Sequence, residues 1–185
     1  MKGKVDDFLG RSVEMHQLIC YLHDYRLVTI KGVPGIGKTS LAKQVGFFLQ
    51  DRITFRNGII YQSVRGLNGV DSAISQIHFE LFNKPAPRGQ GLQAITKFLE
   101  HREVLFIIDN AEDLLQTDQE GFRNMIRHIL QECSHTRCLL TSRCSLGAVA
   151  EITEKIMNLR QLSRTDTATL LFRKSPRLIS EKEVE

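Results

Sequence analysis

The segment GVPGIGKTS, Gly32–Ser40, decides the fold of this chain. It fulfils the spacing G-x-x-x-x-G-K-[ST] of a phosphate-binding P-loop through four residues: Gly32, Gly37, Lys38 and Thr39. The apolar run LVTIK precedes the loop and the amphipathic run KTSLAKQV begins at its end, so the loop stands between a predicted strand and a predicted helix. A glycine-rich turn with an incidental lysine is the alternative, but neither the lysine nor three glycines would help such a turn to fold. We therefore predict a phosphate-binding loop.

The residue types of the loop suit ATP or ADP together with Mg²⁺. Glycines allow backbone N–H groups to turn toward a phosphate, and the N-terminus of the following helix attracts the same anion. We expect the Lys38 ammonium to lie between the β- and γ-phosphates and the Thr39 hydroxyl to bind Mg²⁺. Ser40 and the N–H groups around it are expected to hold the α- and β-phosphates. The predicted nucleotide contacts comprise the whole loop: Gly32, Val33, Pro34, Gly35, Ile36, Gly37, Lys38, Thr39 and Ser40.

A second motif is the run VLFIIDNAED, which contains Asp109. Its apolar residues predict a buried strand that delivers Asp109 at its carboxyl end, the edge at which open α/β sheets bind ligands. A carboxylate at this place holds Mg²⁺ through water. Thr39 and Asp109 are therefore the predicted metal site.

The segment RCLLTSR predicts a further strand that ends just before Arg143. If this strand lies between the strands that lead to Gly32 and Asp109, Arg143 projects toward the terminal phosphate of a nucleotide. A guanidinium suits this place because it is always charged and binds phosphate bidentately. An exposed arginine in a turn is the alternative. On the first interpretation, the predicted catalytic residues are Lys38, Asp109 and Arg143.

Predicted strands and helices alternate along the rest of the chain. Strands are predicted at Leu27–Lys31, Gly58–Ser63, Val104–Asp109, Cys138–Thr141 and Lys155–Leu159. Helices are predicted at Ser12–Asp24, Lys38–Gln50, Asp71–Phe82, Leu92–His101 and Gly121–Cys133, and the second of these is expected to bury Leu41, Ala42, Val45, Phe48 and Leu49. A capping box at Ser163–Asp166 predicts one more helix, which Pro176 ends. Because parallel crossovers need helix-length connections, this order predicts an α/β fold, the three-layer sandwich of P-loop NTPases with a five-stranded parallel sheet.

Composition indicates a soluble protein of one ordinary domain. The chain has 185 residues, of which 42% are hydrophobic, enough for a sizeable core. Its longest apolar run, Val104–Ile108, is far shorter than the roughly 18 residues of a membrane span, and the start MKGKVDDFLG has no apolar signal segment. We therefore predict a cytoplasmic protein with no membrane partner.

Charge and cysteine content favour neither nucleic acid nor zinc as a partner. The net charge of +4 comes from scattered basic residues, apart from a cluster between Arg160 and Arg177 that fits a solvated helix face as well as a nucleic-acid patch. The cysteines have no C-x-x-C spacing, so we expect free thiols that pack as small apolar side chains: Cys20, Cys133, Cys138 and Cys144.

Taken in order, the segments FLGR, GVPGIGKTSLA, VLFIIDNAED, LLTSR and MNLRQLSRTDTATLLF resemble the NB-ARC branch of the STAND signal-transduction ATPases, the switch domains of apoptosome and plant resistance proteins. The resemblance covers nearly the whole chain. It implies that Leu9, Gly10 and Arg11 lie against the adenine and ribose of the nucleotide. It also implies that Asp109 holds magnesium and that Arg143 senses the γ-phosphate.

The chain departs from this family at a position that matters for hydrolysis. Many relatives place a second acidic residue directly after the magnesium aspartate to orient the attacking water, whereas this chain has Asn110. Glu112 and Asp113 are expected to be surface residues at the start of a helix, stabilised by the helix dipole. We therefore expect slow hydrolysis or none.

The resemblance also implies a domain organisation and a function. It implies one nucleotide-binding domain at residues 1–174 and a charged tail at 175–185, where a helical and winged-helix region would begin. The implied function is a molecular switch: ADP holds a closed form, ATP favours self-association or a protein partner, and hydrolysis resets the switch. An AAA-like mechanical ATPase acting on nucleic acid or protein, a small-molecule kinase and a nucleotide-locked scaffold stay open as alternatives. A GTPase is disfavoured because the segment NKPA lacks the aspartate of N-K-x-D.

Overall fold

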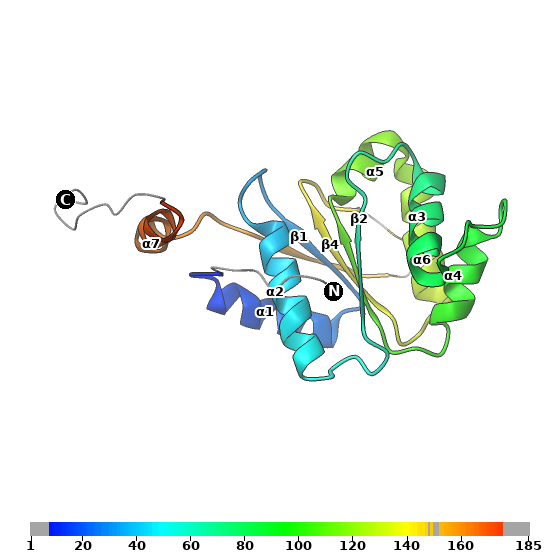
Figure 1. Cartoon of the computed structure of the whole chain (residues 1–185), viewed down its shortest axis with the longest axis horizontal. Helices are drawn as coiled ribbons and strands as arrows, with labels where there is room; N and C mark the ends of the chain where they lie inside the picture. Colours follow the sequence, from blue (N-terminus) through cyan, green and yellow to red (C-terminus); the bar gives the residue numbers. More distant parts are fainter. Residues whose placement is uncertain (1–7, 148, 150–151, 176–185) are drawn as a thin grey trace.

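The chain folds around a single parallel sheet (Figure 1). The computed structural model describes residues 8–147, 149 and 152–175. Five strands in this part of the chain pair in the order β2-β3-β4-β1-β5, each parallel to its neighbours: β1 Leu27–Lys31, β2 Ile59–Ser63, β3 Leu105–Asp109, β4 Arg137–Ser142 and β5 Glu154–Asn158. Each predicted strand is a strand, and its ends differ by no more than one residue from the prediction. The five-stranded parallel sheet is therefore confirmed.

Helices cover both faces of the sheet and make the three predicted layers (Figure 1). One face carries α1 (Ser12–Asp24) and α2 (Lys38–Asp51). The opposite face carries four helices: α3 Val70–Phe82, α4 Gly91–Leu99, α5 Ala111–Thr117 and α6 Gln119–Glu132. Every long helix that the periodicity predicts is present, and α5 begins where the sequence placed the start of a helix at Glu112 and Asp113, although its extent was not predicted.

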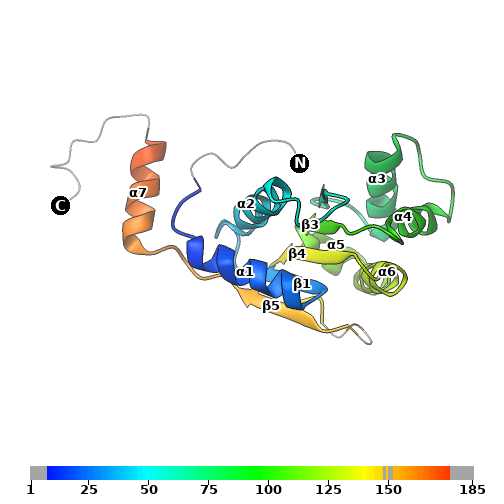
Figure 2. The ribbon, with the colours of Figure 1, turned by 90° about the horizontal axis from the view of Figure 1, so that it is seen from below.

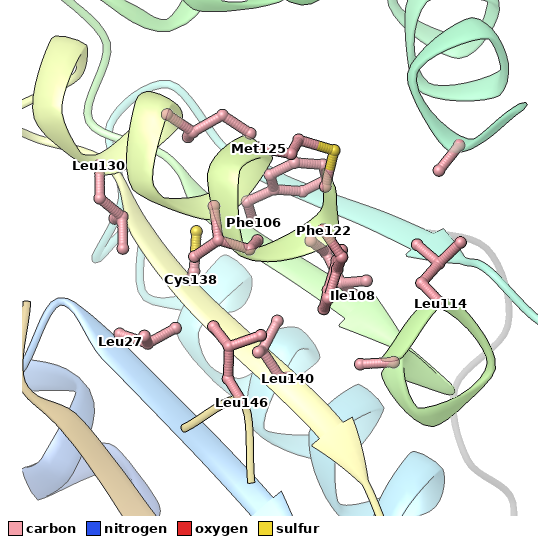
Figure 3. Packing of buried hydrophobic residues seen from close by; sticks show 14 of the residues in the cluster. Leu27, Phe106, Ile108, Leu114, Phe122, Met125, Leu130, Cys138, Leu140 and Leu146 are labelled. Atoms are coloured by element: carbon pink, nitrogen blue, oxygen red, sulfur yellow. The ribbon is translucent and has the colours of Figure 1, made fainter. Parts of the chain in front are cut away.

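Successive side chains of β3 point to opposite faces of the sheet, so the same strand contributes to both hydrophobic clusters. All five residues of β3 are buried. Phe106 and Ile108 pack toward α3–α6, while Leu105 and Ile107 pack toward α1 and α2. Figure 3 shows Phe106 and Ile108 against Phe122 of α6, within the larger of the two clusters. Each fully buried side chain of this size contributes about 1.5–3 kcal/mol to stability, so the position of β3 is strongly fixed.

Details of side-chain burial correct two predictions. In α2, Phe47 is buried and Phe48 only partly so, the reverse of the expected pattern. Cys133 and Cys138 are buried as expected, but Cys20 and Cys144 are exposed because they lie on the outer face of α1 and in the turn after β4. No described helix is both long and apolar enough to cross a membrane.

The last helix, α7 (Arg164–Lys174), stands apart from the sheet in both views (Figures 1 and 2). The predicted capping box is confirmed, since the Ser163 side chain accepts a hydrogen bond from the Asp166 backbone N–H at 3.0 Å. None of the α7 residues is buried. Pro176 and most of the expected tail at 175–185 lie outside the described residues.

Strand order brings the predicted functional residues to one edge. Strand β4 lies between β3 and β1, which is the condition that the prediction for Arg143 required. Because all strands are parallel, the carboxyl ends of β1, β3 and β4 meet at the same edge. The P-loop follows β1, Asp109 ends β3 and Arg143 follows β4, so these groups face a common space.

Candidate nucleotide-binding site

The P-loop has the backbone conformation that its glycines allow. Gly35 and Gly37 have backbone φ angles of 74° and 100°. Residues other than glycine rarely adopt such positive φ angles. At Gly32 the reason is different, because an added Cβ would lie 3.0 Å from the Ile36 side chain and 3.3 Å from the Leu159 carbonyl oxygen. The loop therefore needs glycine for backbone conformation at two positions and for close packing at a third.

The Lys38 ammonium is directed by the loop itself. Its side chain is buried at the start of α2, and Nζ donates hydrogen bonds to the Gly32 and Val33 carbonyl oxygens at 2.9 and 3.2 Å. An ammonium has three donors, and the loop carbonyls take two of them. Lys38 also lines the adjoining cavity. The loop therefore holds a positive charge where an anionic phosphate would be bound.

Thr39 and Asp109 meet as predicted. The Thr39 hydroxyl donates to Asp109 Oδ1 at 2.8 Å, and the Asp109 side chain is buried at the end of β3. Hydroxyl and carboxylate oxygens are ligands that Mg²⁺ prefers, and Mg²⁺ usually takes only one or two protein groups together with phosphate oxygens and water. The described residues contain no cluster of three or more His, Cys, Asp or Glu that could hold a metal alone. The donor set therefore fits a magnesium ion held jointly with a nucleotide, and it offers no zinc site.

Two adjoining cavities flank the loop. The first, of about 400 Å³, is lined mostly by polar and charged side chains: Lys38, Thr39, Ser40, Arg65, Asn110, Glu112, Asp113 and Arg143. The second, of about 350 Å³, is lined by Phe8, Leu9, Ile36, Leu162 and Leu170 together with a few polar residues. Both touch Gly35, Gly37 and Ser40. A charged cavity next to an apolar one suits a ligand with a phosphate end and an aromatic end.

The segment before α1 lies beside the apolar cavity. Leu9 and Arg11 line it. Arg11 is buried, and its guanidinium donates to Glu14 Oε1 at 2.7 Å and to the Ile36 carbonyl oxygen at 3.3 Å. Gly10 packs so closely on Asp166 that a Cβ at this position would clash with it. The segment thus joins the P-loop to the start of α7, and a nucleotide contact of Gly10 and Arg11 stays a prediction.

Glu112 corrects the sequence-based interpretation of the residues after Asp109. It does lie in the first turn of a helix, α5, but its side chain is only 2% exposed and lines the charged cavity. Arg143 Nε donates to Glu112 Oε1 at 3.0 Å, and the Arg143 side chain is 53% exposed. Within the described structure the buried Glu112 Oε2 has no hydrogen-bond partner. A carboxylate therefore lines the charged cavity although Asn110 follows Asp109.

Sequence reasoning missed further residues around Asp109. The Tyr61 hydroxyl donates to Asp109 Oδ2 at 2.9 Å, and the Thr141 hydroxyl donates to Oδ1. Burial first, and then the neighbouring Asp109 carboxylate, raise the pKa of the Tyr61 phenol well above its ordinary value. Arg65, which follows β2, adds a cation to the charged cavity. The LLTSR motif contains Thr141, so the sequence offered a signal for this residue. The contact of Tyr61 with Asp109 depends on the pairing of β2 with β3, which no local motif reveals.

The sheet order, the glycine-rich loop after β1 and the acidic end of β3 define the chain as a P-loop NTPase. A match to the NACHT domain family extends over residues 26–176, most of the chain. The chain therefore belongs to the NACHT domain family, whose members are P-loop NTPases of the STAND class. The STAND class expected from the motifs is confirmed, while the NB-ARC branch stays a prediction.

Known proteins similar to the chain include a putative transcriptional regulator, a STAND ATPase and a nucleotide-bound DnaA. A putative HTH-type transcriptional regulator of Mycobacterium tuberculosis is 28% identical over 149 residues, which are 80% of this chain and 15% of that protein. A STAND protein with a tetratricopeptide repeat sensor from Pyrococcus horikoshii has a TM-score of 0.59 at 20% identity, covering 97% of this chain and 27% of its own. AMPPCP-bound DnaA from Aquifex aeolicus has a TM-score of 0.60 at 16% identity, covering 99% and 56%. The two structures share the fold of this chain, and the chain spans only a small part of the curated relative.

Proposed function

We propose that the chain is the ATP- and ADP-binding switch domain of a larger STAND protein, working by the cycle that the NB-ARC resemblance implies. The observation that carries the proposal is the ion pair between Arg143 and Glu112 in the cavity that Lys38 and Thr39 also line. Lys38 supports binding of either nucleotide, because the β-phosphate is common to both. Arg143 lines the same cavity, and we expect its partner there to be the γ-phosphate, which only ATP has.

The exposure of the two partners explains how the pair would respond to ATP. The Arg143 side chain is about half exposed, so solvent leaves room for it to turn away from the pair, whereas the Glu112 side chain is buried. A γ-phosphate competes with the carboxylate for the guanidinium, because both are bidentate anionic acceptors. Once Arg143 turns to phosphate, Glu112 is released to orient a water molecule for attack on the γ-phosphorus. Mg²⁺, held by Thr39 and Asp109, would neutralise phosphate charge.

The remaining parts of the proposal concern what the switch controls. ADP is expected to hold a closed form, and ATP to favour self-association or binding of a protein partner in the cytoplasm. Hydrolysis is expected to be slow, because the Arg143–Glu112 pair has to separate before Glu112 can orient water. Such a cycle requires different affinities for the two states, which the γ-phosphate contact of Arg143 would supply.

A mechanical ATPase acting on nucleic acid or protein is the second candidate function. Its support is a likeness of fold, at 16% identity, to the replication initiator DnaA bound to AMPPCP and single-stranded DNA. An ATPase that acts on DNA would bind it with an affinity that falls steeply with salt. The switch is expected to bind no DNA, so a salt titration with a labelled oligonucleotide separates the two functions.

The test of the switch is calorimetric titration of Arg143→Ala with ADP and with a non-hydrolysable ATP analogue. Loss of one charge-assisted contact of about 1.5–3 kcal/mol should weaken binding of the analogue about ten- to a hundredfold. ADP affinity should stay nearly constant. The matched control is Arg127→Ala, since Arg127 is an exposed arginine of α6 that bonds only Asn124 among the described contacts. Equal losses for both nucleotides would mean that Arg143 does not distinguish ATP from ADP, and the switch proposal would fail.

A further inference from the structure

The Asp109 carboxylate is surrounded by hydroxyl groups. Thr39 and Thr141 donate to Oδ1, and Tyr61 donates to Oδ2 at 2.9 Å. The Asp109 residue is only 3% exposed. Thr141 Oγ1 also accepts a hydrogen bond from the Asn110 backbone N–H at 3.1 Å, which fixes the backbone directly after the carboxylate. Both oxygens of this buried acid are therefore held in place.

The three donors come from three different elements. Thr39 belongs to α2, while Tyr61 and Thr141 belong to β2 and β4, the strands on either side of β3. The Tyr61 ring is itself restrained, since the Lys43 ammonium of α2 lies 4.8 Å from its centroid. Tyr61 also packs against the core between the sheet and α1–α2. The position of the phenol is thus restrained by contacts other than its hydrogen bond to Asp109.

Counting acceptor positions shows where a metal-bound water would be held. A carboxylate offers about four lone-pair positions. Thr39 and Thr141 occupy those of Oδ1, and Tyr61 occupies one on Oδ2. The position left for a water of Mg²⁺ is therefore on Oδ2, the oxygen that Tyr61 orients. Thr39 can give an oxygen lone pair to the metal while its hydrogen stays on Oδ1.

We propose that Tyr61 is a positioning residue that sets the affinity of the nucleotide site for magnesium by orienting Asp109 Oδ2. This inference rests on the proposed nucleotide-binding function. Tyr61 lines neither of the two described cavities beside the P-loop, so its effect passes through Asp109 and the metal. Partners that orient metal ligands typically change metal affinity by 10- to 100-fold when they are removed. Because Asp109 would hold the metal through water, we expect the lower end of this range.

The first experiment titrates Mg²⁺ into the protein with a fluorescent ADP analogue, and repeats the binding in EDTA. Tyr61→Phe should need about tenfold more Mg²⁺ for half of the metal-dependent gain in ADP affinity, while ADP affinity in EDTA stays at the wild-type value. The matched control is Tyr25→Phe, because Tyr25 is also partly buried and also lies under a lysine, with Lys155 Nζ 5.2 Å from its ring centroid. The control should behave like wild type.

A second measurement leaves Tyr61 intact and uses its fluorescence. The chain has no tryptophan and three tyrosines, so the double variant Tyr21→Phe/Tyr25→Phe reports Tyr61 alone. A phenol that donates to a carboxylate emits weakly, and its emission follows changes at that carboxylate. We expect weak emission from Tyr61 that changes on addition of Mg²⁺ to the ADP complex and does not change on addition of ADP in EDTA.

The outcomes separate this inference from the function on which it rests. If wild-type protein binds ADP neither with Mg²⁺ nor in EDTA, the proposed function itself is wrong. If it binds ADP equally tightly in both, the magnesium site, and with it the role of Tyr61, is overturned while the nucleotide-binding function stands. If Mg²⁺ strengthens wild-type binding and Tyr61→Phe shows an unchanged Mg²⁺ requirement, only the role of Tyr61 is overturned. Equal losses in Mg²⁺ and in EDTA would also overturn it, because Tyr61 would then support the fold of the loop. Strong Tyr61 emission that does not change on addition of Mg²⁺ would likewise overturn the role of Tyr61.

Discussion

The substitution Glu112→Gln tests the role of the carboxylate that the structure buries in the charged cavity, where the sequence had predicted a surface residue. Glutamine has the shape of glutamate and keeps an oxygen that can accept the hydrogen bond now made by Arg143 Nε at 3.0 Å. It removes the charge, and it replaces either Oε1 or the Oε2 that has no described partner with an amide nitrogen, which donates hydrogen bonds and cannot accept a proton from water. Glu112→Gln therefore changes the chemistry of the cavity with little change in its shape.

The expected magnitudes for chemistry and for stability differ widely. General acid–base groups typically contribute 10²–10⁴-fold to rate, which at 1.36 kcal/mol per decade is a barrier change of roughly 2.7–5.4 kcal/mol. An ion pair with one half-exposed partner contributes only about 0–1 kcal/mol to folding, so the melting temperature should move by less than about 4 °C. ADP affinity should stay unchanged because Glu112 is expected to act beside the γ-phosphate.

The assay is single-turnover hydrolysis of radiolabelled ATP by excess protein, with wild type, Glu112→Gln and Asn110→Asp compared side by side. We expect wild-type turnover below the common range of about 1–10³ per second, a further loss of at least a hundredfold in Glu112→Gln, and little change in Asn110→Asp. Asn110 has a left-handed backbone, with φ at 64°, and occupies the N-cap position of α5 without a described capping hydrogen bond from its side chain. If Glu112→Gln hydrolyses ATP at the wild-type rate, Glu112 does not orient the water and our reasoning is refuted.

Two further predictions concern the backbone of the loop and the thiols. Gly37→Ala should lower the melting temperature by about 2–8 °C, because a side chain on a backbone with φ at 100° costs about 1–2 kcal/mol of stability. Steric clash adds nothing, since the added Cβ would meet no described atom within 4 Å. An unchanged melting temperature would show that the loop relaxes to relieve the strain. Alkylation of the native protein at pH 8, followed by mass spectrometry, should modify Cys20 and Cys144 and spare the two buried thiols, because burial raises the pKa of Cys133 to about 11 and of Cys138 to about 12. Rapid modification of all four cysteines would contradict the described burial.

Local patterns predicted the sheet and the P-loop well for a physical reason. Central parallel strands are buried on both faces, so they appear in the sequence as continuous apolar runs such as LFII before Asp109. The loop is encoded by backbone demands at Gly35 and Gly37 that few other residues meet. In contrast, α5 has seven residues, too few to show a helical period, so only its start at Glu112 and Asp113 was expected and its extent was not.

The parts of the site that the sequence did not predict depend on contacts between distant segments. Glu112 was expected at the surface because charged residues are seldom buried without a partner, and its partner Arg143 lies after another strand. Tyr61 reaches Asp109 across the pairing of β2 with β3, in which Ser63 and not Tyr61 is the direct neighbour of Asp109. The division at residues 174 and 175 and the nucleotide contacts of the whole P-loop stay predictions that binding experiments have to test.

The measurement that tests the central claim most directly is the melting temperature with and without Mg²⁺–ADP, for wild type and Lys38→Ala at one ADP concentration. At a hundredfold excess over the wild-type Kd, binding stabilises the fold by about 2.7 kcal/mol, a rise of roughly 5–11 °C. Loss of the Lys38 contact should weaken binding about ten- to a hundredfold and reduce that rise by half or more. Lys97→Ala, an exposed lysine of α4, serves as the control and should show the full rise. A rise in Lys38→Ala as large as in wild type would contradict the claim that this loop binds the phosphates of a nucleotide.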